Sequence, residues 1–295
     1  MSVDTLDVTR YKLKKRFEKE VRAFFRNPLG VIGLVGVMFL SLLAILAPLL
    51  AEPLPEFGNF AYRLLPPSPR HLFGTDDMAL DIFSQVIWGA RSSIRIGAIA
   101  VLVATCIGIP IGLISGYFGK VYDTIGMGLI EVFMTIPMLP LIIVVAAVTR
   151  SNSITTIAIL IGMFAWPSVA RIARSATIKV SSMQYIEAAK SLGIPSRSII
   201  FKHVLLNIVS PVLVNLTIVM ATSIITESAI SFLGLGDPMA YSWGRILHNA
   251  YTSGAFSTAW WFSLFPGISI MLFVISFNFL SIGLRDAIDP KVSRQ

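Results

Sequence analysis

The sequence predicts an all-α integral membrane protein with six transmembrane helices, an amphipathic helix before the first span and a polar helical loop before the fifth. Of its 295 residues, 55% are hydrophobic and only 14% are charged, an apolar content above that of soluble domains. The apolar residues gather in long runs, and in hydrocarbon a helix satisfies its own backbone hydrogen bonds. The predicted spans are residues 29–50, 94–116, 125–148, 154–169, 208–232 and 261–284.

Residues 1–28 form the first predicted segment, a helix lying in the inner membrane interface. Within it, Leu13, Phe17, Val21, Phe24 and Phe25 share one helical face, and Lys and Arg occupy the opposite face. This arrangement is typical of interfacial helices, with a solvated cytosolic helix as the alternative. The first span is too long for a signal peptide and no A-x-A site follows it, so we expect an uncleaved anchor.

The distribution of Lys and Arg predicts the orientation of the spans. Eight of these residues precede the first span, whereas the segments expected outside hold only five. Because Lys and Arg are enriched on the cytosolic side, both termini are predicted to be cytosolic. Residues 51–93 are then extracytoplasmic. A five-span core, residues 94–284, contains a cytosolic loop at residues 171–207 and precedes a cytosolic tail at residues 285–295.

Small residues, prolines and aromatic residues have regular places in the spans. Gly108, Gly112 and Gly116 recur every fourth residue, which predicts a face for close helix packing. Trp260, Trp261 and Phe262 open the last span and fit an aromatic belt at the outer interface. Prolines, which favour kinks by removing a backbone hydrogen bond, occur within the runs at Pro110, Pro137, Pro140, Pro167, Pro211 and Pro266.

Two glutamates lie within apolar runs, where a carboxylate is costly and usually faces the bundle interior or a watery cavity. Glu131 is nearer the inner face. Glu227 lies toward the outer end of its span and, with Ser228 and Ser231, is a candidate for a solute pathway or gate. A hydrogen-bonded structural carboxylate is the alternative.

Several chemistries lack the residues that would perform them. The chain has no G-x-x-x-x-G-K-[ST] loop for nucleotide phosphates, no H-E-x-x-H pair and no G-x-S-x-G turn. Cys106 is the only cysteine, so neither an internal disulfide nor a cysteine zinc site is expected. His71, Asp76, Asp77 and Asp81 lack a metal-binding spacing and are interpreted as polar loop residues. The net charge of +8 resides in the flanks of spans, which favours membrane orientation over nucleic-acid binding.

The polar segment 184–207 is the most informative part of the chain. Residues 185–192 predict one short helix and residues 196–203 a second. Between them, Gly193 accepts the left-handed conformation that ends a helix, and Pro195 prevents its continuation.

The same segment carries residues suited to contact another protein. Ala188 and Ala189 are small, so a second surface can approach closely, and Glu187 adds a charge beside them. Since the chain has no nucleotide loop of its own, we interpret this segment as a docking element for a separate motor subunit. A pair of helices lying on the membrane surface is the alternative.

The order Glu187-Ala188-Ala189, with Gly193 four residues later, resembles the EAA loop of ABC importer permeases. In that family the loop forms coupling helices that sit in a cleft of the ATP-binding subunits. The resemblance implies a type I importer permease fold. It also implies that docking falls to Glu187, Ala188, Ala189, Lys190, Gly193, Ile194 and Pro195.

Further motifs resemble one branch of this family, the second permease subunit of oligopeptide and dipeptide importers, and they cover nearly the whole chain in order. They are Arg26-Asn27-Pro28, Phe73-Gly74-Thr75-Asp76, Gly89-Ala90-Arg91-Ser92-Ser93, Gly116-Tyr117-Phe118-Gly119, the segment from Glu227 to Gly236, Ser242-Trp243-Gly244, Trp260-Trp261, Phe265-Pro266-Gly267 and the segment from Gly283 to Pro290.

The chain departs from this pattern at four places. Leu206 stands where proline is expected, at the entry to the fifth span. In the outer motif, Ala79-Leu80 replaces Gly-Arg and Gln85 replaces a common arginine. Ser281-Ile282 stands where Gly-Asp is usual. These departures concern the outer loop, the entry to the fifth span and the end of the last span.

The resemblance implies a subunit of a heteromeric importer in a prokaryotic inner membrane. Its partners would be a second homologous permease, two ATP-binding subunits and an extracytoplasmic substrate-binding protein, together with membrane lipid and without nucleic acid. No cofactor is expected in this chain, because ATP and Mg²⁺ would be bound by the ATPase subunits. The chain is therefore expected to be a transport subunit and not an enzyme.

Other functions remain as alternatives. Related permeases carry nickel complexes or oligosaccharides instead of peptides, and the sequence does not separate these cargoes. A membrane enzyme using Glu131 and Glu227 lacks histidine or serine partners. An ion channel lacks charge rings along a pore-facing stripe.

Overall fold

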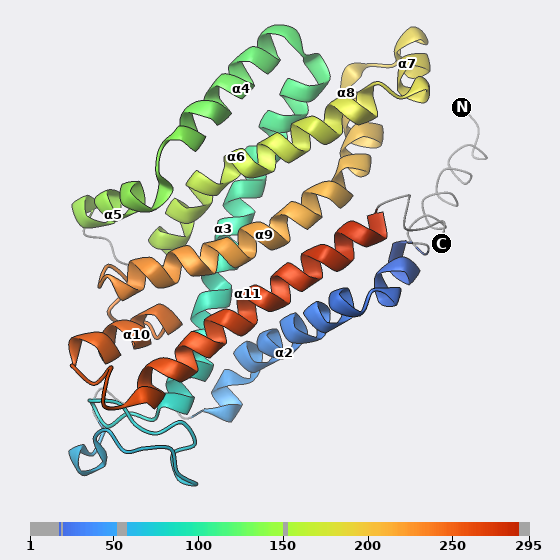
Figure 1. Ribbon diagram of the computed structural model, residues 1–295. Helices are drawn as coiled ribbons and strands as arrows, with labels where there is room; N and C mark the ends of the chain where they lie inside the picture. The colour runs from blue at the N-terminus through green and yellow to red at the C-terminus, as the bar shows by residue number, and fades with distance from the viewer. Residues whose placement is uncertain (1–17, 19, 52–57, 150–152, 289–295) are drawn as a thin grey trace.

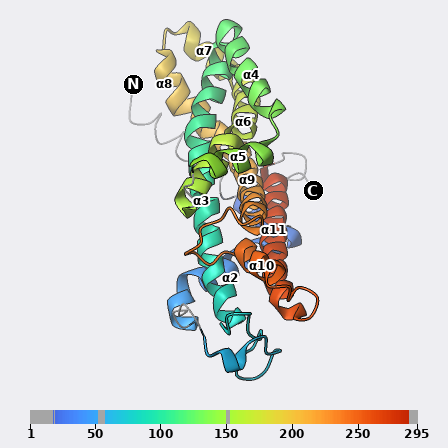
Figure 2. The same ribbon diagram turned by 90° about the vertical axis from the view of Figure 1, so that its left-hand side faces the viewer.

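The computed structural model describes residues 18, 20–51, 58–149 and 153–288. The long helices run side by side in one elongated bundle (Figure 1), which is narrow when turned by a quarter (Figure 2). The elements are α2 (Pro28–Leu50), η1 (Phe60–Tyr62), α3 (Ile82–Phe118), α4 (Lys120–Thr135), α5 (Met138–Thr149), α6 (Ile154–Ser181), α7 (Gln184–Ser191), α8 (Ser196–Ile199), η2 (Ile200–Val204), α9 (Leu205–Phe232), α10 (Trp243–Thr252) and α11 (Trp260–Ile288).

The bundle has two ends, which we name after the short helices found there. The α7 end carries α7 and the start of α2, and the α10 end carries η1, residues 63–81 and α10.

Five of the described helices are long and apolar enough to cross a membrane, and a sixth span is formed if α4 and α5 count as one. The predicted span over residues 125–148, with its expected proline kinks, is broken in the structure, because α4 and α5 meet at a bend of 78°. Proline forces the residue before it out of the helical region. Ile136, which precedes Pro137, accordingly has an extended backbone with φ −77° and ψ 125°, and the helix breaks there.

Two other helices are longer than the spans predicted within them. The helix that contains the second predicted span begins well before residue 94, because α3 starts at Ile82 and its first turn is capped by Asp81. The expected extracytoplasmic segment 51–93 therefore contains the first three turns of α3. The fourth span, expected over residues 154–169, continues to Ser181. Charged residues that flank each apolar run lie inside these helices, because a helix can continue beyond its apolar part.

The predicted glycine face of α3 is confirmed. A methyl group added at Gly108 would lie 2.8 Å from the carbonyl oxygen of Trp166, and one at Gly116 would lie 2.7 Å from Thr177 Cβ. Both neighbours belong to α6. From the opposite direction, a methyl group added at Gly162 of α6 would lie 2.7 Å from the carbonyl oxygen of Ala100 in α3. The two helices therefore pack backbone to backbone along much of their length.

A second close pair, which the sequence analysis missed, joins α2 to α11. A methyl group at Gly30 would lie 2.7 Å from Gly283 Cα, and one at Gly33 would collide with the backbone of Leu280. Asn27 adds a polar contact, because its Nδ2 donates to Asp286 Oδ2 at 2.6 Å. The first span is thus fixed against the last.

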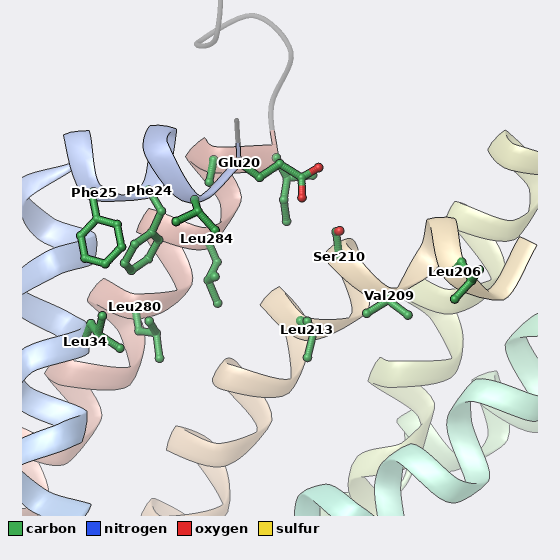
Figure 3. Close-up of a pocket in the computed structure, with 13 residues that line it drawn as sticks. Glu20, Phe24, Phe25, Leu34, Leu206, Val209, Ser210, Leu213, Leu280 and Leu284 are labelled. Atoms are coloured by element: carbon green, nitrogen blue, oxygen red, sulfur yellow. The ribbon is translucent and has the colours of Figure 1, made fainter. Parts of the chain in front are cut away.

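The described part of the N-terminal helix, residues 20–26, packs partly on the bundle. Phe24 is buried near Gly30 and Gly283, whereas Phe25 is exposed. A largely apolar recess of about 540 Å³ is lined by this helix, α9 and α11 (Figure 3). The remaining residues assigned to the interfacial helix, 1–17 and 19, lie outside the described residues.

Aromatic side chains at the α10 end belong to the core more than to a membrane belt. Trp261 is 8% exposed and Phe262 is fully buried, so the expected aromatic belt retains only Trp260 from these three residues. The indole of Trp261 donates to the carbonyl oxygen of Thr75 at 3.2 Å, which ties α11 to the outer loop. Trp243 of α10 is fully buried in the same cluster.

The glycine packing predicts opposite outcomes for the same substitution at two helical positions. In Gly112→Ala, the new methyl would lie 2.5 Å from the carbonyl oxygen of Ala170, so we expect a loss of about 1–3 kcal/mol in stability. Gly128 has nothing within 4 Å, so Gly128→Ala should be neutral or stabilising by up to about 1 kcal/mol. Thermal unfolding in detergent measures both, and equal effects would contradict the packing.

Candidate functional site

The seven predicted docking residues lie together at the α7 end, on α7 and the turn that follows it. Only Ser182 and Met183 separate α6 from α7. The amide of Ile186 donates to the carbonyl oxygen of Met183 at 2.9 Å, and the amide of Ser182 donates to the carbonyl oxygen of Ile178 at 3.2 Å. Because this connection is short and hydrogen-bonded, α7 follows the end of α6 closely.

The predicted glycine stop is confirmed at Gly193, whose φ is +74°. Its amide donates to the carbonyl oxygen of Lys190 at 3.0 Å, and the amide of Ile194 donates to that of Ala189 at 3.1 Å. These two bonds form a Schellman motif, which closes the free carbonyl groups of a helix end. Pro195 then precedes α8, so only four residues, 192–195, connect α7 to α8.

One side of this hairpin is anchored and the other faces outward. Ile186 and Ile199 are fully buried and Ala189 is 9% exposed, all within one apolar cluster shared with α3, α6 and α9. Glu187 and Ala188 are exposed. The buried side fixes the position of α7, and the outward side leaves a small residue and a carboxylate open to a partner.

The other docking residues surround this outward side. Gly193 and Pro195 are exposed and Ile194 is half-buried. Lys190 is exposed, and its Nζ lies 5.0 Å from the centre of the Tyr117 ring at the end of α3. This cation–π contact adds a third element, α3, to those that position α7.

The expected second short helix, residues 196–203, is wrong as a separate element. Residues from Ser196 to Phe232 form one continuous helix, because no helix stop occurs between them. A single wide turn interrupts its regularity at Ile200–Val204, where the amide of Leu205 donates to the carbonyl oxygen of Ile200. Leu206, where proline was expected, keeps its amide and lets the helix run on.

An ion pair that the sequence analysis missed braces the same end. Arg174 of α6 makes a two-pronged contact with Asp123 of α4, with Nη2 2.7 Å from Oδ2. The residues are 51 positions apart, so no local pattern could have predicted the pair. Paired bonds of this kind fix orientation as well as distance.

The candidate pathway residues lie near the α10 end and are buried. Glu227 is 1% exposed, and Ser231 Oγ donates to its Oε1 at 2.7 Å. Ser228 is covered by α10, because a methyl group at Gly244 would lie 2.5 Å from the backbone of Ser228. This arrangement matches the structural alternative for Glu227, and its place in a pathway stays a prediction. Glu131 is exposed on α4.

The outer loop centres on Asp76, which is 1% exposed. Its Oδ1 accepts from the amides of Leu80 at 2.7 Å and Met78 at 2.9 Å, and its Oδ2 accepts from Gln85 Nε2 at 2.6 Å. Burial raises the pKa of Asp76 to about 6, against the lowering effect of these hydrogen bonds. Two of the four departures noted in the sequence, Leu80 and Gln85, therefore contact this one carboxylate.

The other polar residues of the outer loop have structural partners. Asp81 caps α3, since its Oδ2 accepts from the amide of Ser84 at 2.9 Å. His71 Nδ1 lies 3.1 Å from Asp81 Oδ1. Asp77 is half-buried, which raises its pKa, while the charge of Arg63 lowers it. Within the described ranges, no three His, Cys, Asp or Glu residues lie close enough to hold a metal ion.

Two family descriptions match the chain. The binding-protein-dependent transport system inner membrane component matches residues 108–294. The N-terminal transmembrane domain of oligopeptide transport permease C matches residues 19–67. The first match includes α7, and the second includes α2 and the beginning of the outer loop.

Relatives and a solved structure agree with these matches. The dipeptide transport system permease protein DppC of Alkalihalophilus pseudofirmus is 38% identical over 90% of this chain and 87% of its own length. The oligopeptide transport system permease protein OppC of Bacillus subtilis is 34% identical over 92% and 88%. A chain of the inward-facing MetNI methionine ABC transporter has a TM-score of 0.58 at 17% identity, over 70% of this chain and 98% of that chain, which shows a shared fold.

The turn after α7 predicts a graded response at Gly193. Its Cβ would meet nothing within 4 Å, so the cost of Gly193→Ala comes from the left-handed backbone alone, about 1–2 kcal/mol. Asparagine tolerates this conformation better, so Gly193→Asn should retain most of the stability. Hydrogen exchange of the α7 amides measures the difference, and equal exchange in both variants would contradict it.

The buried Asp76 carboxyl predicts a pH-dependent stability. Its pKa is about 6 in the folded chain against 3.8 as the model-compound value, so between these pH values the folded chain holds a proton that the unfolded chain releases. Stability should therefore fall by up to about 3 kcal/mol as the pH rises from 4 through 6, then level off. Thermal unfolding across this range checks the slope, which Asp76→Asn should remove; an unchanged slope would contradict the assignment.

Proposed function

The chain belongs to the family of binding-protein-dependent transport system inner membrane components, and from this premise we propose that it helps to import di- or oligopeptides. It is a permease subunit of an ABC importer, a transport protein and not an enzyme. Relatives that cover most of its length are described as dipeptide or oligopeptide permeases, which supports the peptide cargo. Nickel complexes and oligosaccharides, carried by related permeases, remain the alternative cargoes.

One observation carries the proposed mechanism, which is the rigid attachment of an exposed α7 to two spans. Two residues join α7 to α6, and a four-residue turn joins it to the continuous helix that contains α9. Glu187 and Ala188 face away from the bundle. A force applied to this surface is therefore passed to α6 and α9 together, and neither span can stay in place while α7 moves.

The proposed assembly contains a second, homologous permease, two ATP-binding subunits and an extracytoplasmic binding protein. The ATP-binding subunits, and not this chain, would bind ATP and Mg²⁺. When ATP closes them, they would draw the α7 surfaces of both permeases together and open the pathway outward; hydrolysis would reset it. The family of the chain and its exposed α7 support this arrangement.

The proposed orientation places the α7 end in the cytosol of a prokaryotic cell. Basic residues gather at that end in the described structure, and they include Arg22, Arg26, Lys120, Arg197 and Arg285. Lys and Arg near the ends of spans favour the cytosolic side. The α10 end, with its outer loop, would then receive the cargo from the binding protein.

The coupling proposal predicts that a charge reversal on α7 separates ATP hydrolysis from cargo delivery. In Glu187→Lys, we expect ATPase stimulation by the loaded binding protein to fall about tenfold, because a charge-assisted contact becomes repulsive. The measurement uses the complete importer in vesicles.

Glu18→Lys is the matched control, because it makes the same charge change at another exposed position of the α7 end. Stimulation should stay near that of the unmodified importer. If Glu187→Lys also left stimulation unchanged while the complex remained assembled, α7 would not be the motor contact.

A further inference from the structure

A polar cavity of about 240 Å³ lies at the α10 end, between the outer loop, the start of α3 and α10. Asp76, Asp77 and Gln85 line one side. Tyr241 and Arg245 line the other, with Asn249. This volume is large enough for a small ligand group together with a few water molecules.

The most buried acid of this cavity has no cation beside it. Asp76 accepts hydrogen bonds from two backbone amides and from Gln85 Nε2, all of them uncharged donors. Asp76 belongs to neither of the acid–base contacts between His71 and Asp81 and between Arg174 and Asp123. A buried carboxylate without a counter-ion is unfavourable, so the site is suited to an external cation.

Gln85 provides a second, independent indication. Its side chain is 0% exposed, and its Oε1 has no hydrogen-bond partner although its Nε2 is held by Asp76. A buried acceptor without a donor is unusual and destabilising. The wall that carries Asp76 therefore also carries an acceptor that needs an incoming N–H or O–H group.

The opposite wall does not supply the missing cation. Arg245 lines the cavity, but its Nη1 donates to the carbonyl oxygen of Asp237 at 2.7 Å in the loop before α10, and no hydrogen bond or ion pair joins it to Asp76 among the described residues. Asn249 is neutral, and burial, together with the negative charge of Asp76, raises the pKa of the Tyr241 hydroxyl. Among the cations found on small molecules, a primary ammonium is compact and offers three N–H donors and no acceptor.

We propose that this cavity binds a primary ammonium group, the free amino terminus of the cargo, through the Asp76 carboxylate and Gln85 Oε1. This assignment rests on the proposed function, since it takes the cargo to be a peptide. The ammonium satisfies the unpaired charge and the unpaired acceptor at once. Asp77, on the rim of the same cavity, adds attraction for a cation approaching from outside the bundle.

The direct test uses the complete importer in nanodiscs, without ATP and without the binding protein. The probes are glycinamide, which carries an ammonium, and N-acetylglycinamide, which does not. We expect saturable binding of glycinamide by calorimetry and none of N-acetylglycinamide. Equal binding of the two probes, or binding of neither, would overturn the proposal.

Two variants test the residues. Asp76→Asn keeps an acceptor for the Leu80 amide but removes the charge, and Gln85→Lys supplies an internal ammonium; each should weaken glycinamide binding at least about tenfold. Asp237→Asn makes the same change at the α10 end outside this cavity and should leave binding within about twofold. Unchanged affinity in both Asp76→Asn and Gln85→Lys would overturn the proposal.

The pH dependence adds a separate readout. The binding form of Asp76 is ionised, and its pKa in the empty cavity is about 6, so the dissociation constant should rise about tenfold between pH 7 and pH 5. The other titratable or charged groups of this region are Asp77, Arg63, Tyr241 and Arg245. Asp77 is also a carboxyl with a raised pKa, so it loses charge in the same direction as Asp76 and the profile is compared with that of Asp77→Asn. A flat profile in Asp77→Asn would contradict the role of Asp76.

The complete importer distinguishes the cargo from a partner protein as the source of the ammonium. Asp76→Asn should lower dialanine uptake about tenfold while ATPase stimulation by unloaded binding protein stays unchanged. Loss of that stimulation would place the ammonium on the binding protein and overturn the assignment to the cargo. Because the nanodisc test measures ligand binding without ATP hydrolysis, failure of glycinamide binding leaves the import proposal standing.

Discussion

The burial of Ile186 and Ile199 against the bundle is the interaction on which the rest of the structure depends. Both side chains are fully buried, in the cluster that also contains residues of α3, α6 and α9. An apolar side chain of this size contributes about 1.5–3 kcal/mol when it is removed from water. Without these two anchors, α7 would be a polar loop between spans. With them, it is a rigid projection whose outward side is set by the position of its buried side.

The packing of the spans extends this rigidity through the membrane. Glycines bring α3 onto α6 and α2 onto α11 at backbone distance, so each pair moves as a unit. The bend at Pro137 is the exception, since α5 leaves the direction of α4 by 78°. Movement of α7 would therefore be carried by α6 with α3, and by α9, whereas α4 is held to α6 by Asp123 and Arg174.

Much of this arrangement was predictable from local patterns. Apolar runs located the spans, the spacing of Gly108, Gly112 and Gly116 located a packing face, and Gly193 located the helix reversal. Each of these features depends on residues that are close in sequence.

What the sequence could not provide was the partners of those residues. The Arg174–Asp123 pair and the contact of Asn27 with Asp286 join residues 51 and 259 positions apart, and single-sequence periodicity holds no information at such separations. The break at Pro137 required a choice between a kinked and a broken span. The burial of Asp76 beside Gln85 depended on how the outer loop folds back over α3.

The docking of α7 on an ATP-binding subunit is tested most directly by photo-crosslinking in intact cells from benzoylphenylalanine placed at Ala188. A crosslink to an ATP-binding subunit is the predicted result, and a crosslink only to lipid or to an extracytoplasmic protein would contradict it.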